Sequence, residues 1–126
     1  MDNQIIWIEI PVADFDRAQT FYETLLGTEL TPFPNTGGRR SAMIQSTQDA
    51  GMGVSLLEVE GFNPSPDGVL LYFNAGNDLD GMLARVEPAG GAVVMDRRML
   101  GETPESGYFA TFHDTEGNTL ALFGMG

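Results

Sequence analysis

The sequence has no cysteine, a single histidine, and no lysine among its six basic residues. The absence of cysteine excludes disulfides, thiolate metal sites and cysteine nucleophiles. One histidine leaves little material for a catalytic triad. No apolar run approaches the ~20 residues of a membrane-spanning helix. A phosphate-binding loop is also absent, because Gly37-Gly38 and Gly90-Gly91 are isolated pairs outside a strand–loop–helix context.

Basic residues are outnumbered by 18 acidic residues, which gives a net charge of −12 at pH 7. Nucleic acid binding requires a positive surface, so the charge balance argues against it. An acidic surface attracts cationic ligands, although solubility alone is the simpler explanation of the charge. The opening MDNQIIWIEI lacks the basic start and small-residue cleavage site of a secretory signal, which predicts a cytoplasmic protein.

What is present is an internal repeat in a chain of 126 residues, a length typical of one globular domain. Shifting residues 7–30 by 64 positions aligns them with residues 71–94. Each copy has an apolar extended run, an Asp suited to a helix N-cap, about three predicted helical turns and a Gly at the end. The offset divides the chain into two halves of similar length, which indicates two copies of one unit.

The first copy shows the pattern of a strand followed by a helix. Residues 5–12 alternate as strands do, Asp14 is placed to cap a helix, and Gly27 is placed to end it. In the second copy, Asn77 or Asp78 is the predicted cap, and Pro88 and the following glycines end the helix. The predicted helices present apolar stripes to a sheet, formed by Phe15, Ala18, Phe21, Tyr22, Leu25, Leu26, Leu79, Met82, Leu83 and Val86.

Three further strand-like segments follow each predicted helix, separated by turn signals. They are residues 28–33, 40–46 and 52–59 in the first half and 92–99, 108–113 and 119–123 in the second. The sequence therefore predicts an α+β fold in one domain, residues 1–126, with two tandem βαβββ modules. The modules cover residues 1–60 and 69–126, joined by a linker at 61–68. Placed side by side, they would form a curved mixed sheet with a central cup and helices outside.

Two segments, IPVADFDRAQTFYETLLG and GYFATFHDTEGNTLALF, resemble the vicinal oxygen chelate superfamily. This superfamily includes glyoxalases, ring-cleaving dioxygenases and bleomycin resistance proteins. The first segment resembles the family's strand, "V-x-D" and helix with "FY". The second resembles its "F-x-D-P-x-G-N" hairpin, with Thr115 in place of Pro. The resemblance implies the same fold and, in metal-dependent members, a divalent ion in the cup.

The family's metal-ligand positions carry no His or carboxylate in this sequence. The resemblance transfers them to Trp7, Leu71, Ala121 and either Ser55 or Leu56. Glu9 and Glu58 are each displaced by two residues along their strands, roughly 6–7 Å. We therefore expect no metal and no cofactor, which argues against metal-assisted glyoxalase or dioxygenase chemistry.

Strand alternation then predicts which side chains face the cup. The predicted ligand-binding set is Trp7, Glu9, Leu71, Phe73, Phe109, Thr111, His113, Ala121 and Phe123. This set describes an aromatic, mostly apolar concavity. Glu9 is expected to pair with an arginine such as Arg97 or Arg98, or to lie at an open rim, because an unpaired buried carboxylate is costly.

Three functions remain open. The first is a metal-free module that binds a small cationic or aromatic compound. The second is a metal-independent lyase or isomerase with Glu9 or His113 as general base. The third is an interaction or regulatory domain whose cup is filled by its own side chains. Exposed sheet edges favour a homodimer, with neither a membrane nor nucleic acid as a partner.

Overall fold

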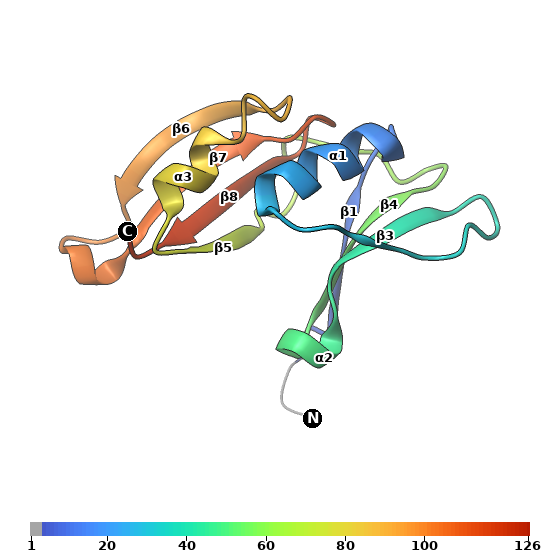
Figure 1. Ribbon diagram of the computed structural model, residues 1–126, viewed down its shortest axis with the longest axis horizontal. Helices are drawn as coiled ribbons and strands as arrows, with labels where there is room; N and C mark the ends of the chain where they lie inside the picture. The colour runs from blue at the N-terminus through green and yellow to red at the C-terminus, as the bar shows by residue number, and fades with distance from the viewer. Residues whose placement is uncertain (1–3) are drawn as a thin grey trace.

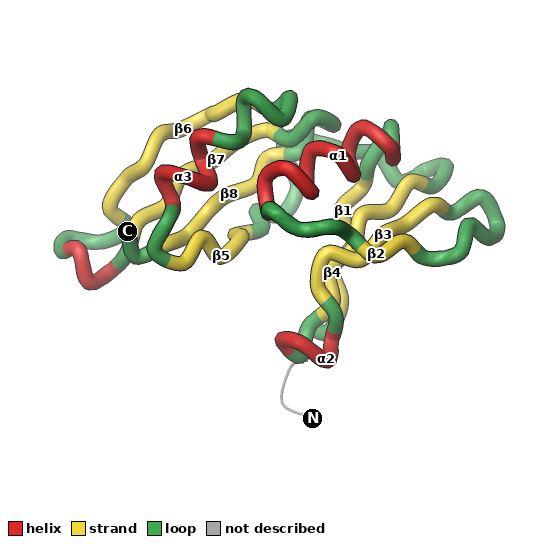
Figure 2. The backbone as a smooth tube through the Cα atoms, in the orientation of Figure 1, coloured by secondary structure: helices red, strands yellow, loops and turns green. Residues whose placement is uncertain are grey.

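The chain folds as two consecutive βαβββ modules (Figures 1 and 2), as predicted. The structure is a computed structural model that describes residues 4–126, so residues 1–3 of the predicted first module lie outside it. The first module contains β1 (Trp7–Pro11), α1 (Phe15–Leu26), β2 (Thr31–Pro32), β3 (Arg40–Gln45), the short α2 (Thr47–Ala50) and β4 (Gly53–Glu58). The second contains β5 (Tyr72–Gly76), α3 (Leu79–Ala84), β6 (Ala92–Met99), a 3-10 turn (Pro104–Ser106), β7 (Tyr108–His113) and β8 (Thr119–Gly124).

Each module contributes its own four-stranded mixed sheet. The strand orders are β1-β4-β3-β2 and β5-β8-β7-β6. In each sheet the first and last strands of the module pair in parallel, and the other pairs are antiparallel. The expected curved sheet is thus divided between the modules, since no strand ladder joins the two halves within residues 4–126. The edges of β1 and β5 are left without a strand partner in this part of the chain.

Helix α1 packs between the two sheets and joins them into one core (Figure 1). As predicted, the Asp14 side chain caps its start by accepting a hydrogen bond from the Arg17 N–H, and Gly27 ends it with φ of 70°. The Phe21 ring lies 6.1 Å from the Phe112 ring of β7, measured between centroids. The α1 side chains therefore pack against the second module as well as their own sheet.

Helix α3 is shorter than the three turns predicted. Asp78 rather than Asn77 caps it, accepting a hydrogen bond from the Gly81 N–H at 3.2 Å. The α-helix ends at Ala84, and the Arg85 N–H turns back to the carbonyl of Met82 in the tighter i→i+3 pattern. A glycine at the third position lowers the helix propensity of so short a segment. The chain continues to residue 90 in turns.

The turn between β7 and β8, residues 114–118, ties the second module to the first. The Glu116 carboxylate accepts hydrogen bonds from the Ala13 N–H at 2.9 Å and the Asp14 N–H at 2.8 Å, where α1 begins. It also forms a two-pronged ion pair with Arg17, at 2.8 and 3.0 Å. Burial alone would raise the pKa of the Glu116 carboxyl, but hydrogen bonds from Arg17, Asp14, Thr115 and Ala13 outweigh it and lower the pKa to about 2.

Two further side chains of this turn connect the modules. The buried Asp114 carboxylate accepts a hydrogen bond of 2.6 Å from the Tyr22 hydroxyl on α1. Asn118 donates to the carbonyl of Pro11 at the end of β1 and accepts from the N–H of Ser65 in the linker. The predicted hairpin residues thus also hold a strand, a helix and the linker in place.

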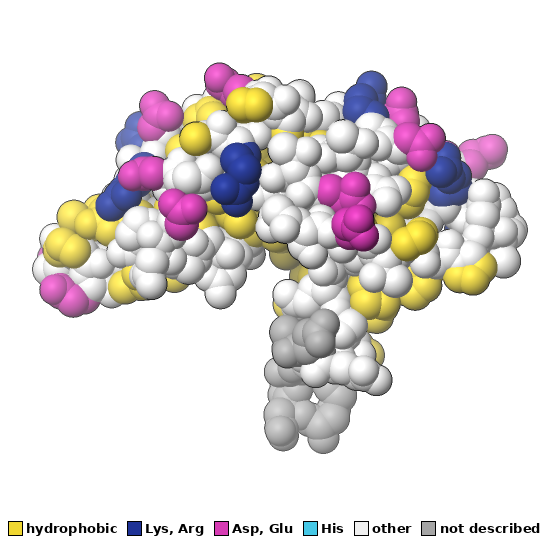
Figure 3. Space-filling view, viewed as in Figure 1, with side chains coloured by type: hydrophobic (Ala, Val, Ile, Leu, Met, Phe, Trp, Pro, Cys, Tyr) yellow, Lys and Arg dark blue, Asp and Glu magenta, His cyan; other side chains and the backbone are white. Residues whose placement is uncertain are grey.

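The exterior mixes charges of both signs. In Figure 3, acidic side chains and arginines are interspersed over the side that carries α1 and α3, so the acidic excess does not form a single patch in this view. Arg40 pairs with Asp16 at 3.0 Å and Arg97 with Asp80 at 2.9 Å. Within residues 4–126, no helix has the length and apolar character that a bilayer crossing requires.

Replacing Glu116 by Gln is expected to lower the free energy of unfolding by about 2 kcal/mol at pH 7, because a buried carboxylate with several donors is neutralised. The folded pKa lies below the unfolded value of 4.5. The stabilisation is therefore complete above pH 4.5 and is lost as the pH falls towards 2. Its size is limited by the exposure of Arg17, which is 52% for the side chain. Urea unfolding from pH 7 to pH 3 measures the difference between the wild type and the variant.

That difference should shrink as the pH falls. The exposed residue Glu87 provides a control, since its change to Gln should leave stability unchanged within about 0.5 kcal/mol. A constant difference between wild type and Glu116→Gln across the pH range would contradict the assignment of the stabilisation to the ionised carboxylate.

Candidate functional site

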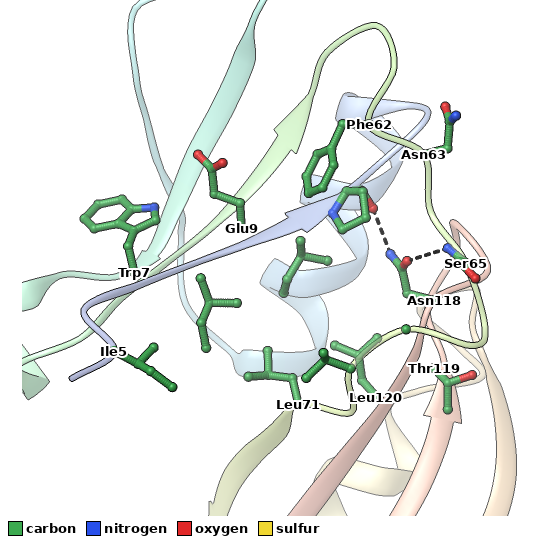
Figure 4. A pocket seen from close by; sticks show the side chains of 15 residues that line it. Ile5, Trp7, Glu9, Phe62, Asn63, Ser65, Leu71, Asn118, Thr119 and Leu120 are labelled. Carbon is green, nitrogen blue, oxygen red and sulfur yellow. Dashed lines mark hydrogen bonds between the residues drawn. The ribbon is translucent and has the colours of Figure 1, made fainter. Parts of the chain in front are cut away.

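A pocket with a volume of about 520 Å³ lies between the two modules, along the free edge of β1 (Figure 4). We call it the seam pocket. Residues of β1 form one wall. Leu71, which precedes β5, and the start of β8 form another, and the linker closes the end nearest Phe62. Its lining residues are Ile5, Trp7, Ile8, Glu9, Ile10, Pro11, Phe62, Asn63, Ser65, Gly68, Val69, Leu71, Asn118, Thr119 and Leu120.

The chemistry of this lining is apolar with one charge. Aliphatic and aromatic side chains dominate it, and Glu9 is the one charged residue among the described residues that line it. The Asn118 side chain is already bonded to Pro11 and Ser65, as the dashed lines in Figure 4 mark, so it is committed to the fold. The lining therefore offers a ligand mainly apolar surface together with one acidic residue.

The planar side chain of Trp7 lies at the rim of the seam pocket and is partly exposed. Its indole lies directly over Gly53 on the neighbouring β4, where a side chain would collide with the ring. The indole Nε1–H donates to the buried Ser55 hydroxyl at 3.3 Å, and the ring lies 6.4 Å from that of Phe33. The residue remains 39% exposed. Trp7 is therefore fixed in orientation while part of its ring surface stays available for contact.

Glu9 pairs with an arginine that sequence reasoning missed. Its carboxylate accepts a hydrogen bond of 3.2 Å from Arg39, and the two side chains are 35% and 50% exposed. Arg97, one of the two arginines named as predicted partners, instead pairs with Asp80 and stacks 3.9 Å above the Tyr108 ring in the second module. The partial exposure of Glu9 agrees with the predicted alternative of an open rim. Glu9 and Arg39 are 30 residues apart in sequence, and no local sequence pattern predicts a contact between them.

Arg39 and Glu9 also line a second hollow on the open face of the first sheet, which we call the Arg39 pocket. Its volume is about 470 Å³, and its lining residues are Trp7, Glu9, Phe33, Pro34, Thr36, Arg39, Ser41 and Ser55. Trp7 and Glu9 line both pockets, so the two pockets are adjacent at these side chains. Glu9 therefore lines both pockets, and its carboxylate pairs with Arg39, which lines the Arg39 pocket.

Two of the predicted cup residues face the other way. Leu71 and Phe73 were expected on the open face, but Phe73 pairs with Leu122 and packs 5.9 Å from the Tyr22 ring in the core. The cause is a β-bulge between Asn74 and Gly76, where Gly76 has φ of 58°. The extra residue shifts the alternation by one, so Tyr72 and Asn74 face the open side. Leu71 packs against the core and lines the seam pocket.

The remaining predicted residues share the open face of the second sheet. Strand pairing places Thr111 beside Ala121, Phe109 beside Phe123, and His113 beside Thr119. None of Phe109, Thr111, His113, Ala121 and Phe123 lines the seam pocket, so the structure separates them from Trp7 and Glu9. Their role as ligand contacts stays a prediction.

The family's metal does not fit the residues at its expected positions. Trp7 supplies no donor for a divalent ion, Ala121 supplies none, and Ser55 rather than Leu56 occupies the open face of β4. Glu58 points away, because its carboxylate accepts a hydrogen bond of 2.8 Å from the Phe15 N–H at the start of α1. Among residues 4–126, no group of three or more His, Asp or Glu side chains is arranged to hold a metal.

Comparison with known proteins agrees with this fold. The model of the Glyoxalase/Bleomycin resistance protein/Dioxygenase superfamily matches residues 4–122. A glyoxylase-like domain-containing protein from Didymella fabae is 34% identical over 127 aligned positions, covering 97% of this chain and 94% of the relative.

Solved structures of similar fold include a glyoxalase/bleomycin resistance protein from Albidiferax ferrireducens T118, with a TM-score of 0.71, 19% identity and coverage of 97% of this chain and 98% of that one. The fosfomycin resistance protein FosX from Listeria monocytogenes has a TM-score of 0.69, 16% identity and coverage of 98% and 92%. The resemblance inferred from the two sequence segments is confirmed, and the chain belongs to the glyoxalase/bleomycin resistance protein/dioxygenase superfamily.

Proposed function

We propose that this protein binds a small molecule in the seam pocket, and that the ligand has an apolar or aromatic body and one positive charge. The observation that carries the proposal is the pocket lining, an apolar cavity of about 520 Å³ whose single charged residue among those described is Glu9. The partly exposed Trp7 ring adds a surface on which an aromatic group or a cation can stack.

The charge of the whole chain supports the same ligand class. A net charge of −12 raises the local concentration of cations near the surface. The family is described in part as bleomycin resistance proteins, and one structural neighbour is named a fosfomycin resistance protein. Those proteins are named for small molecules, which is consistent with a binding role on this fold.

Binding without a metal ion is part of the proposal. The indole of Trp7, the hydroxyl of Ser55 and the methyl of Ala121 occupy the positions expected for metal ligands. Glu9 is therefore the residue that would recognise a polar group of the ligand. A general-base enzyme has less support, because His113 lies on the second sheet outside the seam pocket and Glu9 is already paired with Arg39. A self-filled cup has less support too, because the seam pocket is open and Trp7 is 39% exposed.

Replacing Glu9 by Gln should weaken binding of 4-phenylbutylammonium by up to about fivefold, because a half-exposed ion pair contributes about 1 kcal/mol at most. Binding of the uncharged 4-phenylbutanol should change less than about twofold, since Gln keeps the shape of the side chain. Fluorescence of Trp7, the single tryptophan, reports both titrations. Bleomycin is a larger cationic probe for the same assay.

The exposed Glu87 on the second module supplies the matched control, because Glu87→Gln removes the same charge far from the pocket. Equal weakening of both compounds in Glu9→Gln would mean that Glu9 acts on the fold rather than on charge. If no compound changes the emission and Trp7 is blue-shifted and protected from quenchers, the small-molecule proposal fails and the interaction-domain alternative takes its place.

We further propose that the protein is a homodimer that covers the strand starts beside the seam pocket. Large apolar side chains are exposed there, and the adjoining edges of β1 and β5 lack a strand partner within the described residues. The exposed residues outside the pocket lining are Ile6, Leu70 and Tyr72. A second copy brings a matching surface by symmetry.

The wild type should sediment at twice the chain mass at micromolar concentration. The double change Ile6→Asp and Tyr72→Asp should yield monomers, because it places two charges in the buried interface. Val94→Asp is the control, since Val94 is equally exposed, at 53%, but lies on β6 at the far edge of the second sheet. A wild type that sediments as a monomer, or a Val94 variant that dissociates as fully as the double variant, would contradict this interface.

A further inference from the structure

Glu9 is paired through its carboxylate with Arg39 and is also a lining residue of the seam pocket. Arg39 lies 3.2 Å away and lines the Arg39 pocket, but it does not line the seam pocket. Both members of the pair are accessible to solvent, with side-chain exposures of 50% and 35%. An exposed pair of this kind is held only weakly. A competing cation that enters the seam pocket can therefore displace it.

The backbone at Arg39 is held in a defined conformation by a tight turn. Residues 36–39 form a tight turn in which the Arg39 N–H donates to the Thr36 carbonyl at 3.0 Å. Gly37 and Gly38 have φ of 60° and 74°, which a two-residue hairpin turn of this type requires. The turn fixes where the side chain starts, and the long arginine side chain spans the remaining distance to Glu9.

The next residue reaches the opposite face of the sheet. Arg40 opens β3, pairs with Asp16 on α1 at 3.0 Å, and lies 4.6 Å above the Phe15 ring. Two adjacent arginines thus carry the same charge to the two faces of one sheet, and one of the two contacts Glu9. Because neighbouring residues of an extended chain point to opposite faces, Arg39 is the candidate specificity residue and Arg40 is its control.

We propose that Arg39 is an internal competitor for the Glu9 carboxylate and thereby determines which cations bind. A ligand cation reaches Glu9 from the seam pocket and displaces the guanidinium from the carboxylate into solvent. The net binding free energy is the gain from the ligand's contact with Glu9 minus the loss of the Arg39 contact. Cations that interact weakly with Glu9 are therefore rejected, and the binding of uncharged ligands does not change. The inference rests on the proposed function and names the residue that regulates its charge selectivity.

The test compares Arg39→Gln with Arg40→Gln, using Trp7 fluorescence and the same pair of compounds. Arg39→Gln should tighten binding of 4-phenylbutylammonium about three- to fivefold, because the displaced pair is worth about 1 kcal/mol or less. Binding of 4-phenylbutanol should stay within about twofold in both variants. Both changes lower the net charge by one, so Arg40→Gln corrects for the long-range field. Thermal unfolding of each variant checks that the fold is intact.

The outcomes separate this inference from the proposed function. Tighter cation binding in Arg39→Gln alone supports competition, and so does cation binding that appears in Arg39→Gln when the wild type binds none. An equal change in cation binding in both variants would identify the long-range electrostatic field as the cause. It would overturn the inference but not the proposal that the seam pocket binds a ligand. Weaker cation binding in Arg39→Gln means that Arg39 contacts the ligand, which also overturns it. No binding to any variant overturns both proposals.

Discussion

The ionised Glu116 carboxylate is the interaction on which the arrangement of the two modules depends. The modules share no strand ladder within the described residues, so their relation is set by the α1 core and by the turn at residues 114–118. Glu116 satisfies two N–H groups where α1 begins and pairs with Arg17. The Glu116 side chain itself is fully shielded from solvent, so its charge depends on these donors. The contacts hold the second module at one fixed end of α1.

The seam pocket follows from that attachment. The modules are joined at the 114–118 turn and through α1, whereas the free edge of β1 runs past the start of β5 without pairing to it. Asn118 belongs to both features, because its side chain bonds to Pro11 and Ser65 while it also lines the pocket. Leu120, two residues later, supplies part of the apolar wall (Figure 4). A change in the geometry of the turn would therefore change the width of the pocket.

Much of the fold could be predicted from interactions between residues close in sequence. The predictions that were wrong have physical causes. Asp14, Gly27 and the apolar stripe of α1 act over a few residues, so the helix was predicted with its correct ends. The bulge at Gly76 adds one residue to β5 and reverses which face Phe73 occupies, and alternation cannot detect an insertion of one. The Glu9–Arg39 contact joins β1 to the turn before β3, 30 residues away in sequence, so the candidate site could be found only from the tertiary structure.

The polar residues of this protein divide into two sets with different physical roles. Asp114, Glu116 and Asn118 are largely shielded and each accepts or donates several hydrogen bonds, so substitution leaves buried groups unsatisfied. Glu9 and Arg39 are partly exposed and are joined by one contact. Water can replace that contact at little cost, so these two residues can change without loss of the fold. Substitution of Glu9 or Arg39 should therefore leave the 114–118 turn and the α1 core in place.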